Sequence, residues 1–577
     1  MKILFEGVYY GQGMIKNYGL ESYAAYDMEC NTACIPYVGY MYSPKIEDMI
    51  FILPKVFLFE GSGIIDSEQN KKEIAFGKYE IYDVIDANCE LLKKDNLNKV
   101  IFGLSTWIYQ AIDKYSKRNP KSKIIKRSTL QGVVSNNGNR SQTLLDIILS
   151  LIKFHKDHAN LFTYISIVNS SGNNKIHWNK TIRKVQPIIQ NGTPYYLKFQ
   201  NKSKVTNFDE EIIILFYSVL EYLRHQYNFQ VKPNLNYELL KPRQIDSMIS
   251  QGRGTKVLRR IRHKYFKDEL VQLWKLLYTF FDMSETIRSG KASNEVLLAS
   301  SFNQVFEDMI DSLIGDEIFE DLKNNDDGKE IDHLYKDKSI FEDSMIYYIG
   351  DSKYYSYDLD LDRKSLYKQF TYAKNIIQRN IDIFHKEEGK RTKKEAEIIK
   401  DVRYRDALTK GYNFTPNYFI RGYINGEDIS NGKIDHNSIR LKVHDQEMPT
   451  NLHFENKPFD RDTLVLESYN INFLYVLASY VNNSKDSGIK ESIRKKFRKD
   501  LITLYNKKFN FFKVRPTDGT SLKSFVEQHF YEYHGNMYHT EDTDFIWFAF
   551  DKNTIEKEED LSKTIANVKI VKVELEY

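Results

Sequence analysis

The spacing of hydrophobic positions predicts alternating helices and strands along the chain. Residues 1–115 contain strand-like runs, MKILF and DMIFILPKVFLFE among them, separated by Gly, Pro and Asn. Residues 116–245 place apolar side chains at helical spacing in QTLLDIILSLIKFHKDHANLF and EEIIILFYSVLEYLRHQY, with a strand-like PYYLKF between them. Helices followed by short strands are compatible with a winged-helix-like module that binds DNA or a partner.

The pattern then predicts a third region over residues 246–425 and a C-terminal α+β region over residues 426–577. The third region opens with KVLRRIRHKYFKDELVQLWKLLYTFF. Its apolar residues fall on one predicted helical stripe, made of Val257, Leu258, Ile261, Phe266, Leu270, Leu273, Leu276 and Leu277. A chain of 577 residues is too long for one compact core, so we expect an α/β multidomain protein with these four regions.

Composition and charge narrow the functional classes. The net charge is only +4, but acids and bases are segregated. Residues 251–270 and 485–499 each hold seven Lys and Arg, whereas residues 301–360 hold 17 acids and five lysines. Basic surfaces that hold phosphates, beside an acidic pocket that holds a metal, fit this distribution. A solvated helix face explains the first basic segment equally well.

The N-terminus reaches Glu6 and Gly7 before a long apolar stretch forms, so we expect no signal peptide. The sequence contains no apolar run long enough to span a bilayer, and we expect a cytoplasmic protein with no membrane contact. Its three cysteines, Cys30, Cys34 and Cys89, are too few for a disulfide framework and favour reduced thiols.

The segment DSMIYYIGDSKYYSYD carries the first candidate chemistry. Met345 to Ile349 is an apolar run of strand length, and Asp351 and Lys353 follow it. Side chains at positions i and i+2 of a strand project from the same face, so Asp351 and Lys353 should meet in one pocket. A buried acid and lysine carry a desolvation cost that suggests a function.

A second acid precedes this strand by 19 residues. Asp332 lies in the strand candidate KEIDHLYKD, and a hairpin through KDKSIFED would bring it beside Asp351. Two close carboxylates repel each other unless a cation lies between them. An oxygen-only site of this kind selects Mg²⁺ or Mn²⁺. His333 should point to the opposite face of its strand.

Two helices flank the hairpin. Glu307 lies at the edge of the apolar face of one helix, and Gln369 lies on the amphipathic SLYKQFTYAKNIIQRNI, which a strand, NYFIRGYI, follows. The alternative is a surface hairpin with incidental charges.

This order of acids, lysine and elements resembles the core of PD-(D/E)xK nucleases, a mixed sheet flanked by helices. The resemblance implies that Asp332, Asp351 and the backbone carbonyl of Ser352 bind Mg²⁺, with Glu307 as a supporting ligand. It also implies that Lys353 positions or activates water and that Gln369 supports the site or the phosphate. Ile331 departs from the pattern, which usually has a proline there.

Four stretches resemble the LlaJI family of restriction endonucleases, relatives of McrC. They are YVGYMYSPKIEDMIFILPKVFL, KIHWNKTIRKVQPIIQNGTPYYL, DSKYY and FENKPFDRDTLVLESYNINFLYVLASY, which begin at residues 37, 175, 351 and 454. The resemblance implies a subunit that cuts foreign double-stranded DNA in a bacterial restriction system. It also implies an McrB-like AAA+ NTPase partner, and a cognate DNA methyltransferase is compatible with such a system.

The chain itself lacks a G-x-x-x-x-G-K-[ST] phosphate loop, so any NTP-driven step must come from another chain. Gly426 to Lys433 is one residue too long for that motif. The DNA-binding candidates are Arg253, Lys256, Arg259, Arg260, Arg262, Lys180 and Arg183. A catalytically silent DNA- and NTPase-docking adaptor and an RNase of abortive defence are the alternative functions.

Overall fold

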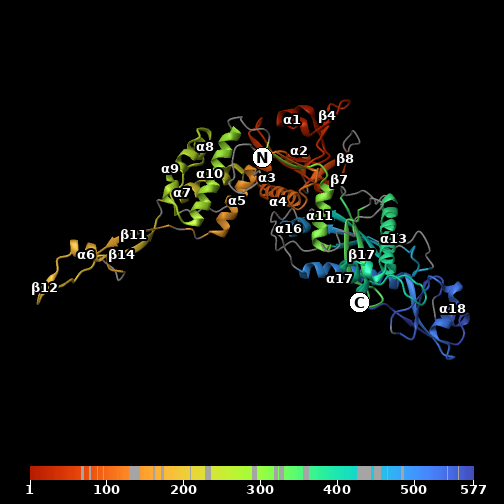
Figure 1. The fold of residues 1–577 in the computed structure, drawn as a ribbon. Coiled ribbons are helices and arrows are strands. Elements are labelled where there is room, and N and C mark those ends of the chain that lie inside the picture. Colours follow the sequence, from red (N-terminus) through yellow and green to blue (C-terminus); the bar gives the residue numbers. More distant parts are fainter. Residues whose placement is uncertain are drawn as a thin grey trace.

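The computed structural model describes most of the chain. The described residues are 1–65, 71–76, 79–87, 89–94, 96–128, 143–159, 161, 163–170, 175–207, 210–227, 236–288, 295–316, 323, 330–354, 363–424, 443–446, 457–463, 465–482, 487–541, 543–555 and 558–577. They form an α/β protein with several sheets and many helices (Figure 1). None of the described helices combines the length and apolar composition that a bilayer crossing requires.

A five-stranded mixed sheet organises the N-terminal part. Its strands, in spatial order, are β1 (Lys2–Phe5), β6 (Asp48–Leu53), β5 (Val38–Ser43), β15 (Glu295–Ala299) and β10 (Ile125–Ser128). The long helix α4 (Leu97–Arg118) packs against β5, β6 and β15 through an apolar face. We call this sheet, α4 and the segments directly after β1 and β6, which contain Glu6 and Lys55, the N-terminal module. β15 lies far along the sequence, yet it pairs with β5, which local patterning did not reveal.

Smaller elements surround this sheet. They are β2 (Tyr9–Gly11), α1 (Gln12–Tyr18), η1 (Glu21–Tyr23), β3 (Ala25–Asp27), β4 (Thr32–Cys34), η2 (Lys55–Phe57), β7 (Leu58–Ile65), β8 (Lys71–Ala75), β9 (Tyr79–Glu80), α2 (Ile81–Val84) and α3 (Glu90–Lys94). The three cysteines are free.

Helices form a group beside the N-terminal module. They are α5 (Leu144–Asp157), α7 (Glu211–Tyr227), α8 (Pro242–Ser250), α9 (Arg253–Ile261), η3 (Arg262–Lys264) and α10 (Asp268–Arg288). The prediction of a single apolar helical stripe from Val257 to Leu277 was wrong at its centre. The chain leaves the helix between α9 and α10, and Phe266 is 85% exposed. The break lets α10 fold back on α9, where the Trp274 indole N–H donates to the Leu258 carbonyl at 2.7 Å.

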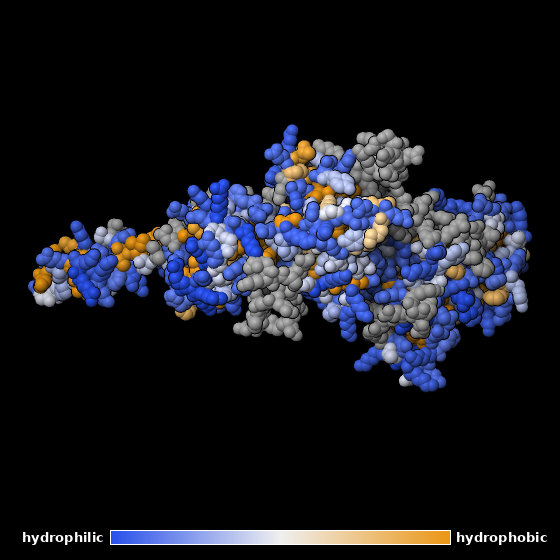
Figure 2. All heavy atoms as spheres, turned by 90° about the horizontal axis from the view of Figure 1, so that it is seen from above, coloured by the Kyte–Doolittle hydropathy of each residue, from blue (hydrophilic) through white to orange (hydrophobic). Residues whose placement is uncertain are grey.

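An arm, residues 164–207, projects away from this helical group (Figure 1). It contains β11 (Tyr164–Asn169), α6 (Trp178–Lys184), β12 (Ile188–Gln190), β13 (Thr193–Tyr195) and β14 (Asn201–Thr206). β11 pairs with β14, and β12 pairs with β13. Hydrophobic side chains lie along its surface (Figure 2), and the exposed ones include Tyr164, Ile167, Trp178, Ile182, Ile188, Ile189, Tyr195, Leu197 and Val205.

A second five-stranded mixed sheet lies at the centre of the C-terminal half. Its strands, in spatial order, are β16 (His333–Lys338), β17 (Met345–Lys353), β18 (Pro416–Tyr423), β20 (Val465–Asn472) and β19 (Val443–Gln446). β17, β18 and β20 are parallel, whereas β16 and β19 are antiparallel edge strands. The surrounding elements are α11 (Phe302–Ile314), α13 (Arg363–His385), η5 (Glu388–Lys390), α14 (Lys393–Asp401), α16 (Phe473–Val481) and α17 (Ser487–Lys508).

Both faces of β16 and β17 are buried. Leu334, Tyr347 and Ile349 pack with α13, whereas Tyr335 and Tyr348 join the large core on the other side. The sheet therefore lies between α13 and α11, and charged residues on it must be paired or functional.

A four-stranded antiparallel sheet ends the chain. Its order is β22 (Met537–Tyr538), β23 (Ile546–Asp551), β21 (Phe509–Pro516) and β24 (Val568–Val573), with α18 (Leu522–Tyr533) and α19 (Glu558–Thr564) beside it. The four predicted domain boundaries stay predictions.

Candidate active site

The end of β17 presents an acid and a lysine to one pocket. Alternation along this strand puts Ile349, Asp351 and Lys353 on the face toward α13. Asp351 is 1% exposed, and its Oδ2 contacts the Lys353 ammonium. The predicted pairing of these two side chains is therefore present.

Gly350 allows the strand to reach this position. It faces the neighbouring parallel strand, and a Cβ at residue 350 would lie 2.3 Å from Cε2 of the Tyr418 ring. A side chain here would push β17 away from β18, directly before Asp351.

Asp332 lies beside this strand end, as the hairpin prediction required. His333 is opposite Gly350 in the antiparallel register, so Asp332 is adjacent to the Asp351–Ser352 segment. The Ser352 backbone N–H donates to Asp332 Oδ2 at 2.8 Å. Burial, and then the negative charges of Asp351 and Glu307, raise the pKa of Asp332 to about 7. Asp332 itself lies one residue before β16, not within it.

Glu307 reaches the same pocket from α11. Its Oε1 accepts from the Asn303 side-chain amide at 3.4 Å. Burial and the charge of Asp351 raise the pKa of Glu307 to about 7, against the opposing effects of Asn303, Lys368 and Lys353. Asp351 and Glu307 thus both lie close enough to Asp332 for their charges to oppose its ionisation.

A second lysine, absent from the sequence prediction as a site residue, also faces the acids. Lys368 Nζ on α13 lies 3.8 Å from Asp351 Oδ1 and 5.3 Å from the centroid of the Tyr372 ring. Burial lowers the pKa of Lys368, but Tyr372 and the charge of Asp351 outweigh it and raise that pKa. The signal was the spacing: Lys368 and Tyr372 are four residues apart on one helix face.

Gln369, the predicted partner on the same helix, points elsewhere. Its side chain is fully buried, and Nε2 donates to the Tyr418 carbonyl of β18 at 3.4 Å. Its contact is therefore to the sheet backbone and not to the carboxylates.

His333 lies on the opposite face of β16, as expected. Its Nε2 contacts the Ser352 hydroxyl, and its Nδ1 lies 3.4 Å from Asp311 Oδ1 on α11. Lys323 Nζ approaches the other Asp311 oxygen at 2.6 Å. This buried group fixes Ser352 from behind, while the Ser352 N–H holds Asp332 in front.

The residues present suit a hard divalent cation. Asp332, Asp351, Glu307 and the Ser352 carbonyl supply oxygen donors. In the described part of the chain no three His, Cys, Asp or Glu side chains already have a metal-ligand arrangement, and the Lys353 ammonium lies against Asp351 instead. Burial and the charges of neighbouring carboxylates raise the pKa of Asp332 and Glu307, and a cation would relieve the repulsion between those charges.

The comparisons with known proteins identify the family. The model of the LlaJI restriction endonuclease family matches residues 47–420, more than half of the chain. The chain belongs to the LlaJI restriction endonuclease family. The matched segment contains all the acids and lysines described above.

No curated protein matches the chain. Among solved structures, the chain is similar to a refined half-complex from a tetradecameric assembly of Thermococcus gammatolerans McrB AAA+ hexamers with bound McrC. The identity is 11% and the TM-score 0.26, with 84% of this chain and 99% of that chain covered.

The predicted DNA-binding residues of this LlaJI-family chain differ in their surroundings: some contact other protein groups, and others are exposed. Arg259 donates to the Tyr278 hydroxyl, Arg260 lies 3.6 Å from Glu211, and Arg262 donates to the Tyr265 carbonyl at 3.0 Å. Arg253 and Lys256 are exposed on α9. Lys180 and Arg183 lie on α6 in the arm, far from the acids (Figure 1).

The second basic segment has a structural role. On α17, Arg494 donates to the Ile314 carbonyl at 2.6 Å and to Asp316 at 2.7 Å, which satisfies the C-terminal end of α11. Arg498 donates to the Ser339 carbonyl at 2.9 Å. These arginines hold α11 and the end of β16 in place, whereas the interpretation of this segment as a phosphate surface stays a prediction.

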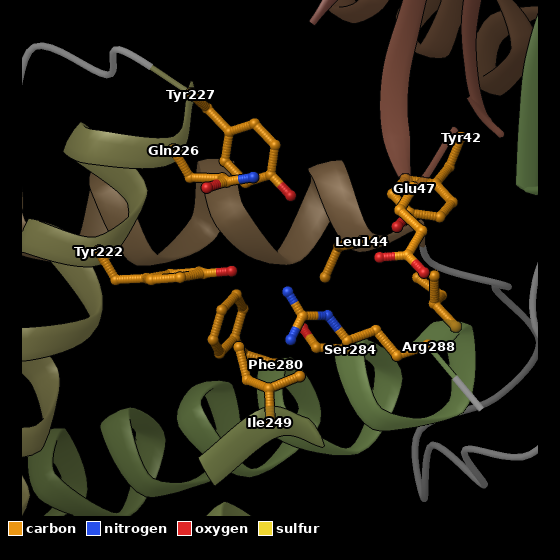
Figure 3. A pocket seen from close by; sticks show the side chains of 11 residues that line it. Tyr42, Glu47, Leu144, Tyr222, Gln226, Tyr227, Ile249, Phe280, Ser284 and Arg288 are labelled. Carbon is orange, nitrogen blue, oxygen red and sulfur yellow. The ribbon is translucent and has the colours of Figure 1, made fainter. Parts of the chain in front are cut away.

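A separate small hollow lies between β5 and the helical group (Figure 3). Tyr222, Phe280 and Arg288 line it from α7 and α10. The Arg288 guanidinium is paired with Asp246 at 2.6 Å. Because Asp332, Asp351 and Lys353 do not line it, this hollow is distinct from the candidate active site.

Proposed function

We propose that this chain is a Mg²⁺-dependent DNA endonuclease subunit of a bacterial restriction system, with a nuclease core of the PD-(D/E)xK kind. The supporting observation is the meeting of Asp332, Asp351 and Lys353 at one end of the β16–β17 hairpin. The helix before the hairpin contributes Glu307, and the helix after it contributes Lys368.

The cation would be held by Asp332, Asp351, the Ser352 carbonyl and Glu307. Such an ion lowers the pKa of a bound water and stabilises charge on the phosphate. Mn²⁺ fits the same donors.

The lysines serve the proposed reaction through their own charge. Lys353 projects from the same strand face as Asp351, so an ammonium at this place can orient a water toward a phosphodiester bound at the acids. Lys368 is more exposed, and it brings a second positive charge toward the negative phosphate.

The partner is the second part of the proposal. The sequence has no phosphate loop, so we assign NTP hydrolysis to an McrB-like AAA+ subunit. We assign contact with DNA or this partner to the predicted region 116–245, for which a winged-helix-like arrangement stays a hypothesis. Within it, the arm is the favoured contact surface because many of its apolar side chains are exposed. A cognate methyltransferase completes the expected system.

Plasmid cleavage tests the proposed activity. Wild type and Lys353→Ala are incubated with Mg²⁺ and plasmid DNA, with and without the proposed McrB-like NTPase. We expect Lys353→Ala to lower the cleavage rate about 10²-fold or more, because the water loses its orienting ammonium. DNA affinity in a gel-shift assay should change little.

Lys338→Ala is the matched control. Lys338 is an exposed lysine of β16, paired with Asp343 at 3.1 Å at the far end of the hairpin. Its variant should cleave like wild type. Equal cleavage by wild type and Lys353→Ala would refute the assigned site, and cleavage of RNA but not DNA would refute the assigned substrate.

A further inference from the structure

The residue directly after Lys353 connects the candidate active site to the N-terminal module. Tyr354 is 8% exposed, and its hydroxyl donates to Glu6 Oε2. The Lys55 backbone N–H donates to the same hydroxyl at 3.1 Å. The Lys55 ammonium lies 5.0 Å from the centroid of the Tyr354 ring. Glu6 follows β1 and Lys55 begins η2, so every polar contact described here comes from the N-terminal part of the chain.

The ring of Tyr354 is held by the opposite helix. Its centroid lies 5.6 Å from that of Phe302 and 6.0 Å from that of Phe306, both on α11. Phe306 immediately precedes Glu307. One tyrosine therefore contacts the helix that carries Glu307 and directly follows the lysine that contacts Asp351.

The N-terminal module also contacts α11 at a second place. From α4, Arg118 lies 3.4 Å from Asp308 and contacts Ser312. The Tyr115 hydroxyl on α4 donates to Gln304 at 3.4 Å. The module thus holds α11 along one side and holds the end of β17 through Tyr354.

We propose that Tyr354 is a positioning residue, and that its hydroxyl, held by Glu6 and the Lys55 backbone, makes the placement of Lys353 depend on the N-terminal module. The proposal rests on the proposed nuclease function. A buried hydroxyl with a charged acceptor and a backbone donor fixes the residue more firmly than ring packing alone. Lys353 is one peptide away, at the last residue of β17 that pairs with β18, and beyond the end of the pairing with β16.

Removal of the hydroxyl alone tests this role. Tyr354→Phe keeps the ring contacts with Phe302 and Phe306 but leaves Glu6 and the Lys55 N–H without the hydroxyl. With the full chain, Mg²⁺ and a duplex DNA, we expect kcat to fall about tenfold while KM stays within about twofold, since an orienting group is displaced without loss of DNA contacts. Hydrogen exchange of the Ser352 and Lys353 amides should become faster.

Two further variants separate positioning from folding. Glu6→Gln keeps an acceptor oxygen and should retain most of the wild-type kcat, whereas Glu6→Ala should behave like Tyr354→Phe. Tyr115→Phe removes a tyrosine hydrogen bond between the same module and α11, away from Lys353, and should match wild type in kcat and amide exchange.

The outcomes are distinguishable. Wild-type kcat and wild-type amide exchange in Tyr354→Phe would overturn the proposal, as would equal losses in Tyr354→Phe and Tyr115→Phe. If wild type cleaves no DNA, the proposed function fails, but amide exchange in Tyr354→Phe and Glu6→Ala still decides whether the hydroxyl holds Lys353.

Discussion

At the residue scale, two acids of the site, Asp332 and Glu307, lie in surroundings that oppose their ionisation. Burial and the charges of Asp351 and Glu307 raise the pKa of Asp332 to about 7. A carboxyl whose folded pKa exceeds its unfolded value binds more protons in the native state between those two values. Native stability is therefore lost as the pH rises from about 4 to about 7, and it stays lower above that range.

The stability of Asp332→Asn in the absence of divalent metal should therefore depend on pH differently from that of wild type. The amide cannot ionise, so the variant avoids the free-energy cost of a buried negative charge beside two other carboxylates. It should therefore melt at a higher temperature than wild type at pH 8. The difference should shrink at pH 5, where wild-type Asp332 is protonated. Thermal unfolding in EDTA at the two pH values measures it.

Added Mg²⁺ should reverse this order at pH 8, because only wild type offers the full set of carboxylates to the ion. Asp343→Asn is the control: its side chain is 97% exposed, and its melting temperature should follow wild type at both pH values. If Asp332→Asn is no more stable than wild type at pH 8 in EDTA, the assigned repulsion between the carboxylates is contradicted.

At the element scale, a few contacts determine where each helix presents its residues. The apolar face of α11 predicted that Glu307 lies at its edge, and the structure places Glu307 near the acids. The C-terminal end of α11 is satisfied by Arg494 of α17. The sequence shows residues 485–499 only as a basic run, and nothing in it indicates that one of these residues binds the end of a helix.

We therefore predict that Arg494→Ala lowers stability and not phosphate binding. Loss of its hydrogen bonds to Ile314 and Asp316 should reduce the free energy of unfolding by about 1–3 kcal/mol, measured by urea denaturation. The slope of log Kd for DNA against log salt should remain that of wild type.

The exposed pair on α9 should behave in the opposite way. Replacement of Arg253 and Lys256 by alanine should leave stability nearly unchanged and reduce the salt slope by about one per lost phosphate contact. A reduced slope in Arg494→Ala would contradict the structural role, and an unchanged slope in the α9 variant would remove that helix from the DNA surface.

At the scale of the whole molecule, the arm and the active site are far apart, and the N-terminal module lies between them (Figure 1). The strands of the arm pair with each other in two ribbons. Its exposed apolar residues, Ile189 at 71% and Leu197 at 76% among them, suit contact with a partner more than a role in folding.

Replacement of residues 175–200 by a short Gly-Ser linker tests whether the arm serves contact with a partner and not folding. The melting temperature of the remaining chain should stay unchanged, because the removed segment packs mainly within the arm. Basal Mg²⁺-dependent cleavage should persist, whereas binding to the NTPase and its stimulation of cleavage should be lost. Full stimulation without the arm would place the partner surface elsewhere, and a lower melting temperature would show that the arm supports the fold.

The sequence by itself determined the local features of this protein. Alternation placed Asp351 and Lys353 on one strand face and His333 on the opposite face from Asp332. The hairpin spacing brought Asp332 to Asp351, and several helices followed from their apolar periodicity. These inferences succeeded because each depends on residues that are close along the chain.

Only the tertiary structure decided the rest. The pairing of β15 with β5, the contact of Gln369 with β18, the approach of Lys368 to Asp351 and the Arg494 contact with α11 all join distant segments. Phe266 reads as a core residue by periodicity, but the helix breaks around it. Periodicity reports which face of an element is apolar, whereas the partner that covers that face is set by the packing of the whole chain.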